Sequence, residues 1–89
     1  MRSPDGTMIG IVEDDAVMGQ SLEMSLRLDG FRPRLWTHGA EALSALSRAP
    51  APEALVCDIR LPDMTGEALF GALPRLPCRP PVLFMTAFA

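Results

Sequence analysis

Three short apolar runs in this sequence are each followed by residues that bear oxygen ligands. The pairs are TMIGIV (7–12) with Glu13, Asp14 and Asp15, ALVC (54–57) with Asp58, and VLFM (82–85) with Thr86. Clustered carboxylates repel one another and raise each other's pKa unless a cation lies between them. Oxygen ligands select a hard ion, and a few carboxylates with positions open to water suit Mg²⁺ better than a closed Ca²⁺ site. If these side chains converge, we expect a magnesium site that phosphate oxygens complete.

Convergence depends on the elements between these groups. Amphipathic stretches predict helices over Ala16–Leu28, Ala40–Ser47 and Gly66–Leu73, and an alternating stretch predicts a strand over Arg32–Thr37. Strands alternating with helices indicate an α/β fold with a doubly wound parallel sheet. The continuously apolar runs are expected in its centre, whereas Pro33 confines its strand to an edge. Since the carboxyl ends of parallel strands share one side of the sheet, the oxygen ligands should meet there.

The first helix carries signals at both of its ends. Asp15 is a candidate N-cap, and Gly30 is a candidate for the left-handed residue that follows the C-terminus. Met18, Leu22 and Leu26 recur at a spacing of four, with Met24 and Leu28 beside them, and we expect this set to form the apolar face.

Length and charge narrow the function classes. The 89 residues allow one small domain, which we place at 7–89 after a flexible N-terminus at 1–6. The net charge of −3 argues against nucleic-acid binding by this segment, because phosphate backbones call for a basic face. The sequence shows no signal peptide and no apolar run of membrane-spanning length, so we expect a cytoplasmic protein that does not associate with membranes.

Each polar group also has an ordinary structural explanation. Acids after a strand often cap the next helix, residues 58–63 resemble turn chemistry, and Thr86 alone is more often a hydroxyl at a strand end. The joint occurrence at the ends of three predicted central strands is what favours a functional site.

Three sequence blocks carry a resemblance to a known family. IVEDD (11–15), CDIRLPDMTG (57–66) and VLFMTA (82–87) resemble, in order and separation, signature blocks of the receiver domains of two-component response regulators. The resemblance runs from Met8 to the last residue. It implies a flavodoxin-like fold with strand order 2-1-3-4 and a phosphorelay role, in which a sensor histidine kinase or phosphotransfer protein phosphorylates the chain.

The resemblance also implies a role for each site residue. Asp58 is the phosphoacceptor and gives one oxygen to Mg²⁺, and Asp14 is a direct metal ligand. Glu13 acts on the metal through water, and Arg60 contributes its backbone carbonyl. Thr86 is the switch hydroxyl, which moves toward the phosphoryl group.

The chain departs from this family in its C-terminal part. Receiver domains continue through a further helix, a fifth strand with a lysine, and a last helix, whereas this sequence ends at Ala89 and contains no lysine. We therefore expect a receiver that lacks its fifth strand and its phosphoryl-binding lysine. The fourth strand would then be an exposed edge, through which the chain could self-associate.

Three other functions compete with this one. A degenerate or truncated receiver that acts only as a protein-interaction module is the main alternative. An aspartyl-phosphate phosphohydrolase needs a second acid two residues after the nucleophile, and position 60 is arginine, so we expect no enzyme activity. A nucleotide-binding domain is disfavoured because no glycine-rich fingerprint follows the first strand.

Overall fold

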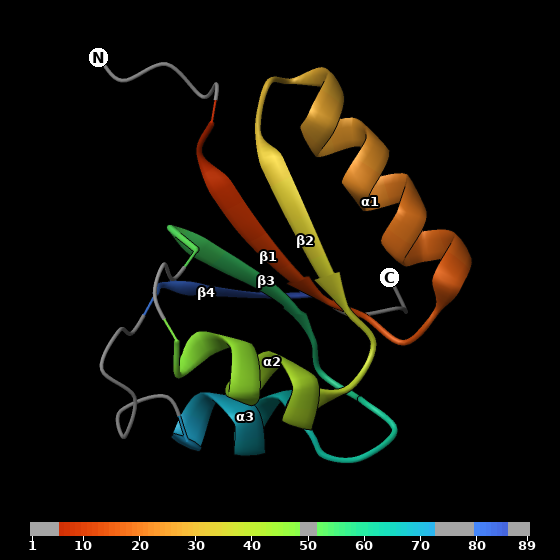
Figure 1. The fold of residues 1–89 in the computed structure, drawn as a ribbon. Coiled ribbons are helices and arrows are strands. Elements are labelled where there is room, and N and C mark those ends of the chain that lie inside the picture. Colours follow the sequence, from red (N-terminus) through yellow and green to blue (C-terminus); the bar gives the residue numbers. More distant parts are fainter. Residues whose placement is uncertain (1–5, 49–51, 73–79, 86–89) are drawn as a thin grey trace.

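The computed structural model describes residues 6–48, 52–72 and 80–85. Strands and helices alternate along the chain (Figure 1). The strands are β1 (Met8–Val12), β2 (Arg32–Trp36), β3 (Ala54–Asp58) and β4 (Val82–Met85), and the helices are α1 (Ala16–Leu28), α2 (Gly39–Leu46) and α3 (Gly66–Ala72). The predicted elements are confirmed to within one residue at their described ends, and Leu73 lies outside the described residues.

The four strands form one parallel sheet in the order β2-β1-β3-β4. Helix α1 lies on one side of this sheet, and α2 and α3 lie next to each other on the opposite side (Figure 1). This arrangement is the doubly wound, flavodoxin-like fold that the sequence predicted, and the predicted strand order is confirmed.

Proline and apolar content explain the order of the strands. β2 pairs with β1 alone among the described strands, with Pro33 opposite Ile9, so the missing N–H of proline costs little at this edge. β1 and β3 are paired on both sides, and Ile11, Val12 and Leu55 are fully buried. Strands that are covered on both faces need such continuous apolar sequences.

Both ends of α1 have the predicted caps. The Asp15 side chain accepts a hydrogen bond from the Met18 N–H at 3.0 Å. At the other end Gly30 has φ 92°, and the Phe31 N–H donates to the Leu26 carbonyl at 3.0 Å, which closes a Schellman motif. The first cap fixes the direction in which the chain leaves β1, just after its acidic residues.

The main core lies between the sheet and helices α2 and α3. Its fully buried side chains include Leu46, Leu55, Cys57 and, at 1% exposure, Leu69. The apolar face of α1 is narrower than predicted, since Met24 is 64% exposed and Leu28 is 81% exposed. Each lies two positions, or about 200°, beyond the inward leucines, which turns it away from the sheet. None of the described helices is long and apolar enough to cross a membrane.

Candidate functional site

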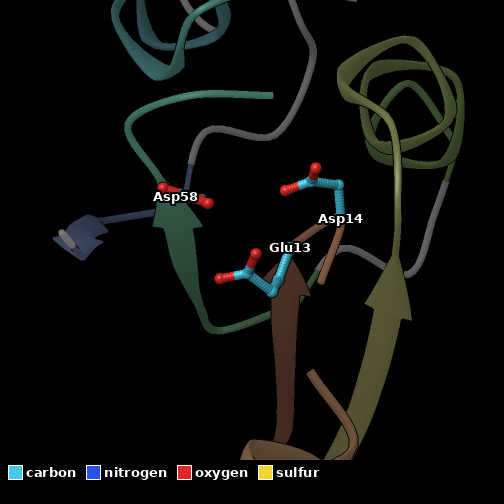
Figure 2. Close-up of side chains that lie close together, drawn as sticks. All are labelled: Glu13, Asp14 and Asp58. Carbon is cyan, nitrogen blue, oxygen red and sulfur yellow. The ribbon is translucent and has the colours of Figure 1, made fainter. Parts of the chain in front are cut away.

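Three acidic side chains meet where β1 and β3 end. Glu13 and Asp14 follow β1 directly, Asp58 is the last residue of β3, and the two strands pair with Val12 opposite Cys57. One carboxylate oxygen from each acid lies within 4.8 Å of the other two. Figure 2 shows the three side chains around one space beyond the strand ends. The convergence expected from the sequence is therefore present for these three residues.

The three carboxylates differ in their access to solvent. Glu13 is 3% exposed and Asp58 9%, whereas Asp14 is exposed. Glu13 and Asp58 thus form the buried part of the site, and Asp14 lies on its solvent-exposed side. Asp14 is therefore the acid of the cluster that is most accessible to solvent.

The electrostatics of the cluster favour an added positive charge. Burial raises the pKa of Glu13 from 4.5 to about 7, although a hydrogen bond of 3.0 Å from the Asp15 N–H opposes the increase. Hydrogen bonding to Asp58 and Asp14 and the negative charge of Asp58 also contribute to this raised pKa. Without a cation the cluster therefore tends to hold a proton on Glu13 near neutral pH, and a cation that binds here replaces that proton.

The donor set suits a hard divalent ion. All three groups are carboxylates, one of them open to solvent, and Mg²⁺ is usually held by one or two carboxylates while it keeps several waters. Neither histidine nor cysteine belongs to the cluster among the described residues. The residues present therefore fit magnesium better than a transition metal.

The loop between β3 and α3 begins at the candidate phosphoacceptor. The Arg60 N–H donates to Asp58 Oδ1 at 3.2 Å, which limits rotation of that carboxylate. Arg60 and Thr65 form an antiparallel bridge, and the Gly66 N–H donates to the Ile59 carbonyl at 2.6 Å. The loop is thus closed at its base, and the Arg60 backbone lies in this closed part.

Gly66 is required by the closeness of this backbone. A Cβ at position 66 would lie 2.6 Å from the Asp58 carbonyl oxygen and 3.1 Å from the Ile59 Cα. Backbone atoms cannot move away as a flexible side chain can, so any other residue would displace the loop or the end of β3. The backbone of this loop therefore accounts for glycine at position 66.

The predicted switch residue, Thr86, lies outside the described residues. The residue before it, Met85, is in register with Asp58, and its carbonyl accepts the Ile59 N–H at 3.2 Å. The end of β4 therefore lies beside the end of β3. The role of Thr86 stays a prediction.

One residue that organises this region was not identified from the sequence. Asp63 accepts hydrogen bonds from the Gly39 and Ala40 N–H groups at 2.8 and 2.9 Å, and so caps α2. These two backbone donors lower the pKa of the Asp63 carboxyl. The only sequence signal was indirect, because His38 before the helix is a poor capping residue and makes no capping bond with its side chain.

Comparison with known proteins agrees with this architecture. The family model of the response regulator receiver domain matches residues 9–89. TcrX of Mycobacterium tuberculosis is 33% identical over 89 residues, which cover 98% of this chain and 38% of TcrX. The DNA-binding transcriptional regulator NtrC of Escherichia coli K12 is 35% identical over 80 residues, which cover 90% of this chain and 17% of NtrC. The chain thus spans well under half the length of these curated relatives.

Solved structures show the same fold. The receiver domain of a sensor histidine kinase from Pseudomonas aeruginosa PAO1, which has a magnesium ion coordinated in its active-site cleft, superposes with a TM-score of 0.86 at 30% identity. That match covers 94% of this chain and 70% of the other. A response regulator receiver domain from Methylobacillus flagellatus gives a TM-score of 0.78 at 30% identity, covering 92% and 69%. Because the family model matches most of this chain, the chain belongs to the response regulator receiver domain family.

Proposed function

We propose that Asp58 accepts a phosphoryl group from the phosphohistidine of a sensor histidine kinase or phosphotransfer protein. The observation that carries this proposal is the convergence of Glu13, Asp14 and Asp58 at one end of the sheet, with one side open to solvent. An Asp58 carboxylate oxygen forms the new bond to phosphorus while the bond from phosphorus to the histidine nitrogen breaks. The imidazole leaves with a proton from solvent, and the product is an acyl phosphate.

Magnesium is the cofactor in this proposal. Asp14 and Asp58 would bind it directly, Glu13 through water, and Arg60 through its backbone carbonyl. When bound, the ion supplies positive charge that offsets the negative charge of the carboxylates and the incoming phosphoryl group. The carboxylate donors and the raised pKa of Glu13 support this assignment. The Pseudomonas receiver domain, with its coordinated magnesium, is a precedent within the family.

The protein's own groups prepare Asp58 for this step. The Arg60 N–H holds one carboxylate oxygen at 3.2 Å, and burial of Asp58 at 9% exposure limits competing water. The exposed Asp14 marks the side from which the donor can approach. Thr86, whose hydroxyl would turn toward the phosphoryl oxygens, and a cytoplasmic location complete the proposal.

Acetyl phosphate with Mg²⁺ provides the test. We expect one phosphoryl group on Asp58, stable in acid and labile in base, and no labelling of the Asp58→Asn variant. Asp29→Asn is the matched control, because it makes the same change at an exposed acid at the end of α1. Label that persists in Asp58→Asn, or that is found on His38, would contradict the assignment.

A second candidate function is that of a protein-interaction module that keeps the fold without the chemistry. Within these 89 residues no lysine is present to pair with a phosphoryl group on Asp58. Removal of such a charge partner commonly costs orders of magnitude in rate. The two functions differ in two results. A pure interaction module takes no label from acetyl phosphate, and its Asp58→Asn variant binds the partner as well as the wild type does.

A further inference from the structure

The loop between β3 and α3 is fastened to the start of α2 by a single carboxylate. Asp63 accepts the Gly39 N–H at 2.8 Å through one oxygen and the Ala40 N–H at 2.9 Å through the other. The first N–H groups of a helix have no partner within the helix, so these bonds satisfy two of them. Gly39 and Asp63, which form the first of these bonds, are 24 residues apart in the sequence.

The local sequence at the start of α2 does not supply this cap. His38 makes no capping bond with its side chain, and the Thr37 hydroxyl donates to Glu41 Oε1 at 3.1 Å. Two N–H groups of α2 therefore depend on an acid from another loop. This dependence makes the contact a tertiary link rather than an ordinary local cap.

A close packing contact lies beside the two hydrogen bonds. A Cβ at position 39 would lie 2.5 Å from the Cγ and Sδ atoms of Met64. The Met64 side chain thus occupies the space that Gly39 leaves open. The loop is held against α2 both by the Asp63 carboxylate and by this contact, so its position has little freedom while both are intact.

The fastened loop is the one that leads from the candidate phosphoacceptor. Its two halves are joined by the Arg60–Thr65 bridge and by a bond of 3.0 Å from the Leu61 N–H to the Met64 carbonyl. Through these bonds the position of Asp63 fixes that of the Arg60 backbone, which in turn holds Asp58 Oδ1.

The other end of the link also leads back to the acidic cluster. The Glu13 N–H donates to the Trp36 carbonyl at 2.9 Å, and the chain continues from Trp36 through two residues into α2. Asp63 therefore joins the segment that follows β3 to the segment that adjoins the end of β1. The first of these segments follows Asp58 directly, and the second is hydrogen-bonded to Glu13.

We propose that Asp63 is a positioning residue of the magnesium and phosphoacceptor site. By tying the β3–α3 loop to α2 it keeps the Arg60 backbone, and through it the Asp58 carboxylate, in the geometry that binds the metal. This inference rests on the proposed function, since it assigns Asp63 to the same site. Asp63 itself bonds to α2 and acts on the site only through the loop.

Nuclear magnetic resonance gives two readouts on the 89-residue chain, a titration with MgCl₂ and the exchange rates of backbone amides. We expect Asp63→Ala to bind Mg²⁺ about 3- to 10-fold more weakly, at or below the loss seen when a direct partner of a metal ligand is removed. The amides of Gly39, Ala40 and Leu61 should exchange faster. Asp63→Asn keeps one acceptor oxygen and should lie between Asp63→Ala and the wild type.

Two further variants distinguish the effect of the loop position from the effect of a lost negative charge and from general destabilisation. Glu67→Ala removes an exposed acid from the first turn of α3 and should leave the Mg²⁺ affinity unchanged. Gly39→Ala retains Asp63 but forces Met64 away, so it should weaken Mg²⁺ binding as Asp63→Ala does. Because both changes act on one contact, the double variant should lose less than the two single losses combined.

The possible failures are distinguishable. Wild-type affinity in Asp63→Ala, or in Asp63→Asn if the alanine variant does not fold, would overturn the positioning role and leave the proposed function intact. Wild-type affinity in Gly39→Ala would overturn the claim that the loop position matters. No Mg²⁺ binding by the wild type would overturn the proposed function and this inference together.

Discussion

The buried carboxyl of Glu13 should make the metal-free protein less stable as the pH rises. Its pKa is about 7 in the folded chain and 4.5 in the ordinary solvated state. The group therefore contributes stability that is fully present below pH 4.5 and is lost as the pH rises through about 7. Because one pKa unit corresponds to about 1.4 kcal/mol, the whole change amounts to roughly 3 kcal/mol.

Replacing Glu13 with glutamine isolates this contribution. Glutamine keeps the size of the side chain and cannot ionise, so the Glu13→Gln variant should lose the part of the pH dependence that lies between about pH 4.5 and 7. A net stability of about 5–15 kcal/mol makes a change of roughly 3 kcal/mol easy to measure. The difference should be largest at pH 8, where the wild type carries the buried charge and the variant does not.

Urea unfolding in the presence of a chelator, from pH 5 to pH 8, measures both proteins under matched conditions. Subtraction of the two curves cancels the titrating groups that do not interact with Glu13. Asp29→Asn, at an exposed position, should follow the wild type. Parallel curves for the wild type and Glu13→Gln over this range would refute the view that Glu13 is desolvated.

The same titration predicts how the metal responds to pH. If Mg²⁺ replaces the proton on Glu13, its affinity for the wild type should rise by up to tenfold per pH unit below about 7 and level off above it. Calorimetry in buffers of different ionisation enthalpy counts the protons released. An affinity that does not change between pH 5.5 and 8 would show that the metal and this proton do not compete.

Three other predictions concern the frame around the site. Gly66→Ala should destabilise the fold by about 1–3 kcal/mol and weaken Mg²⁺ binding, because its Cβ would meet the Asp58 carbonyl at 2.6 Å, and chemical denaturation tests it. Asp15→Ala should cost about 1 kcal/mol through loss of the α1 cap without loss of Mg²⁺ binding, and equal stability to the wild type would argue against that cap. The 89-residue polypeptide should self-associate through β4, the last of the described strands in the sheet, where Leu83 is 68% and Phe84 37% exposed. Sedimentation of the wild type and of Leu83→Asp decides this, and a cooperative monomer of the wild type would contradict it.

Sequence patterns predicted a parallel sheet with the Pro33 strand at its edge and the acids at one end, and the family resemblance supplied the strand order. The run 54–57 lies in the centre and Pro33 at an edge, as expected, whereas the equally apolar run 82–85 forms β4, which pairs with β3 alone among the described strands. Once the order is fixed, parallel pairing brings Glu13 beside Asp58 without any knowledge of side-chain contacts. Periodicity and topology therefore determine this part of the site.

The role of Asp63 could not be predicted in the same way. Its partners are backbone N–H groups, which every residue but proline has, so the sequence gives no sign of which helix it caps. The apolar face of α1 was misjudged for a different reason. Met24 and Leu28 are apolar by type, but only the observed orientation of α1 on β2 shows that they face away from the sheet.

Three consecutive acids in this chain occupy three different environments, and strand geometry is the reason. Successive side chains at the end of a strand point in opposite directions, so Glu13 turns into the protein at 3% exposure and Asp14 turns to solvent. Asp15 already belongs to the start of α1 and caps it. A shift of the strand by one residue would bury Asp14 and expose Glu13, and the helix would lose its cap. The order of the acids therefore matters as much as their number. A shift in the register of β1 would remove the site even though every carboxylate remained.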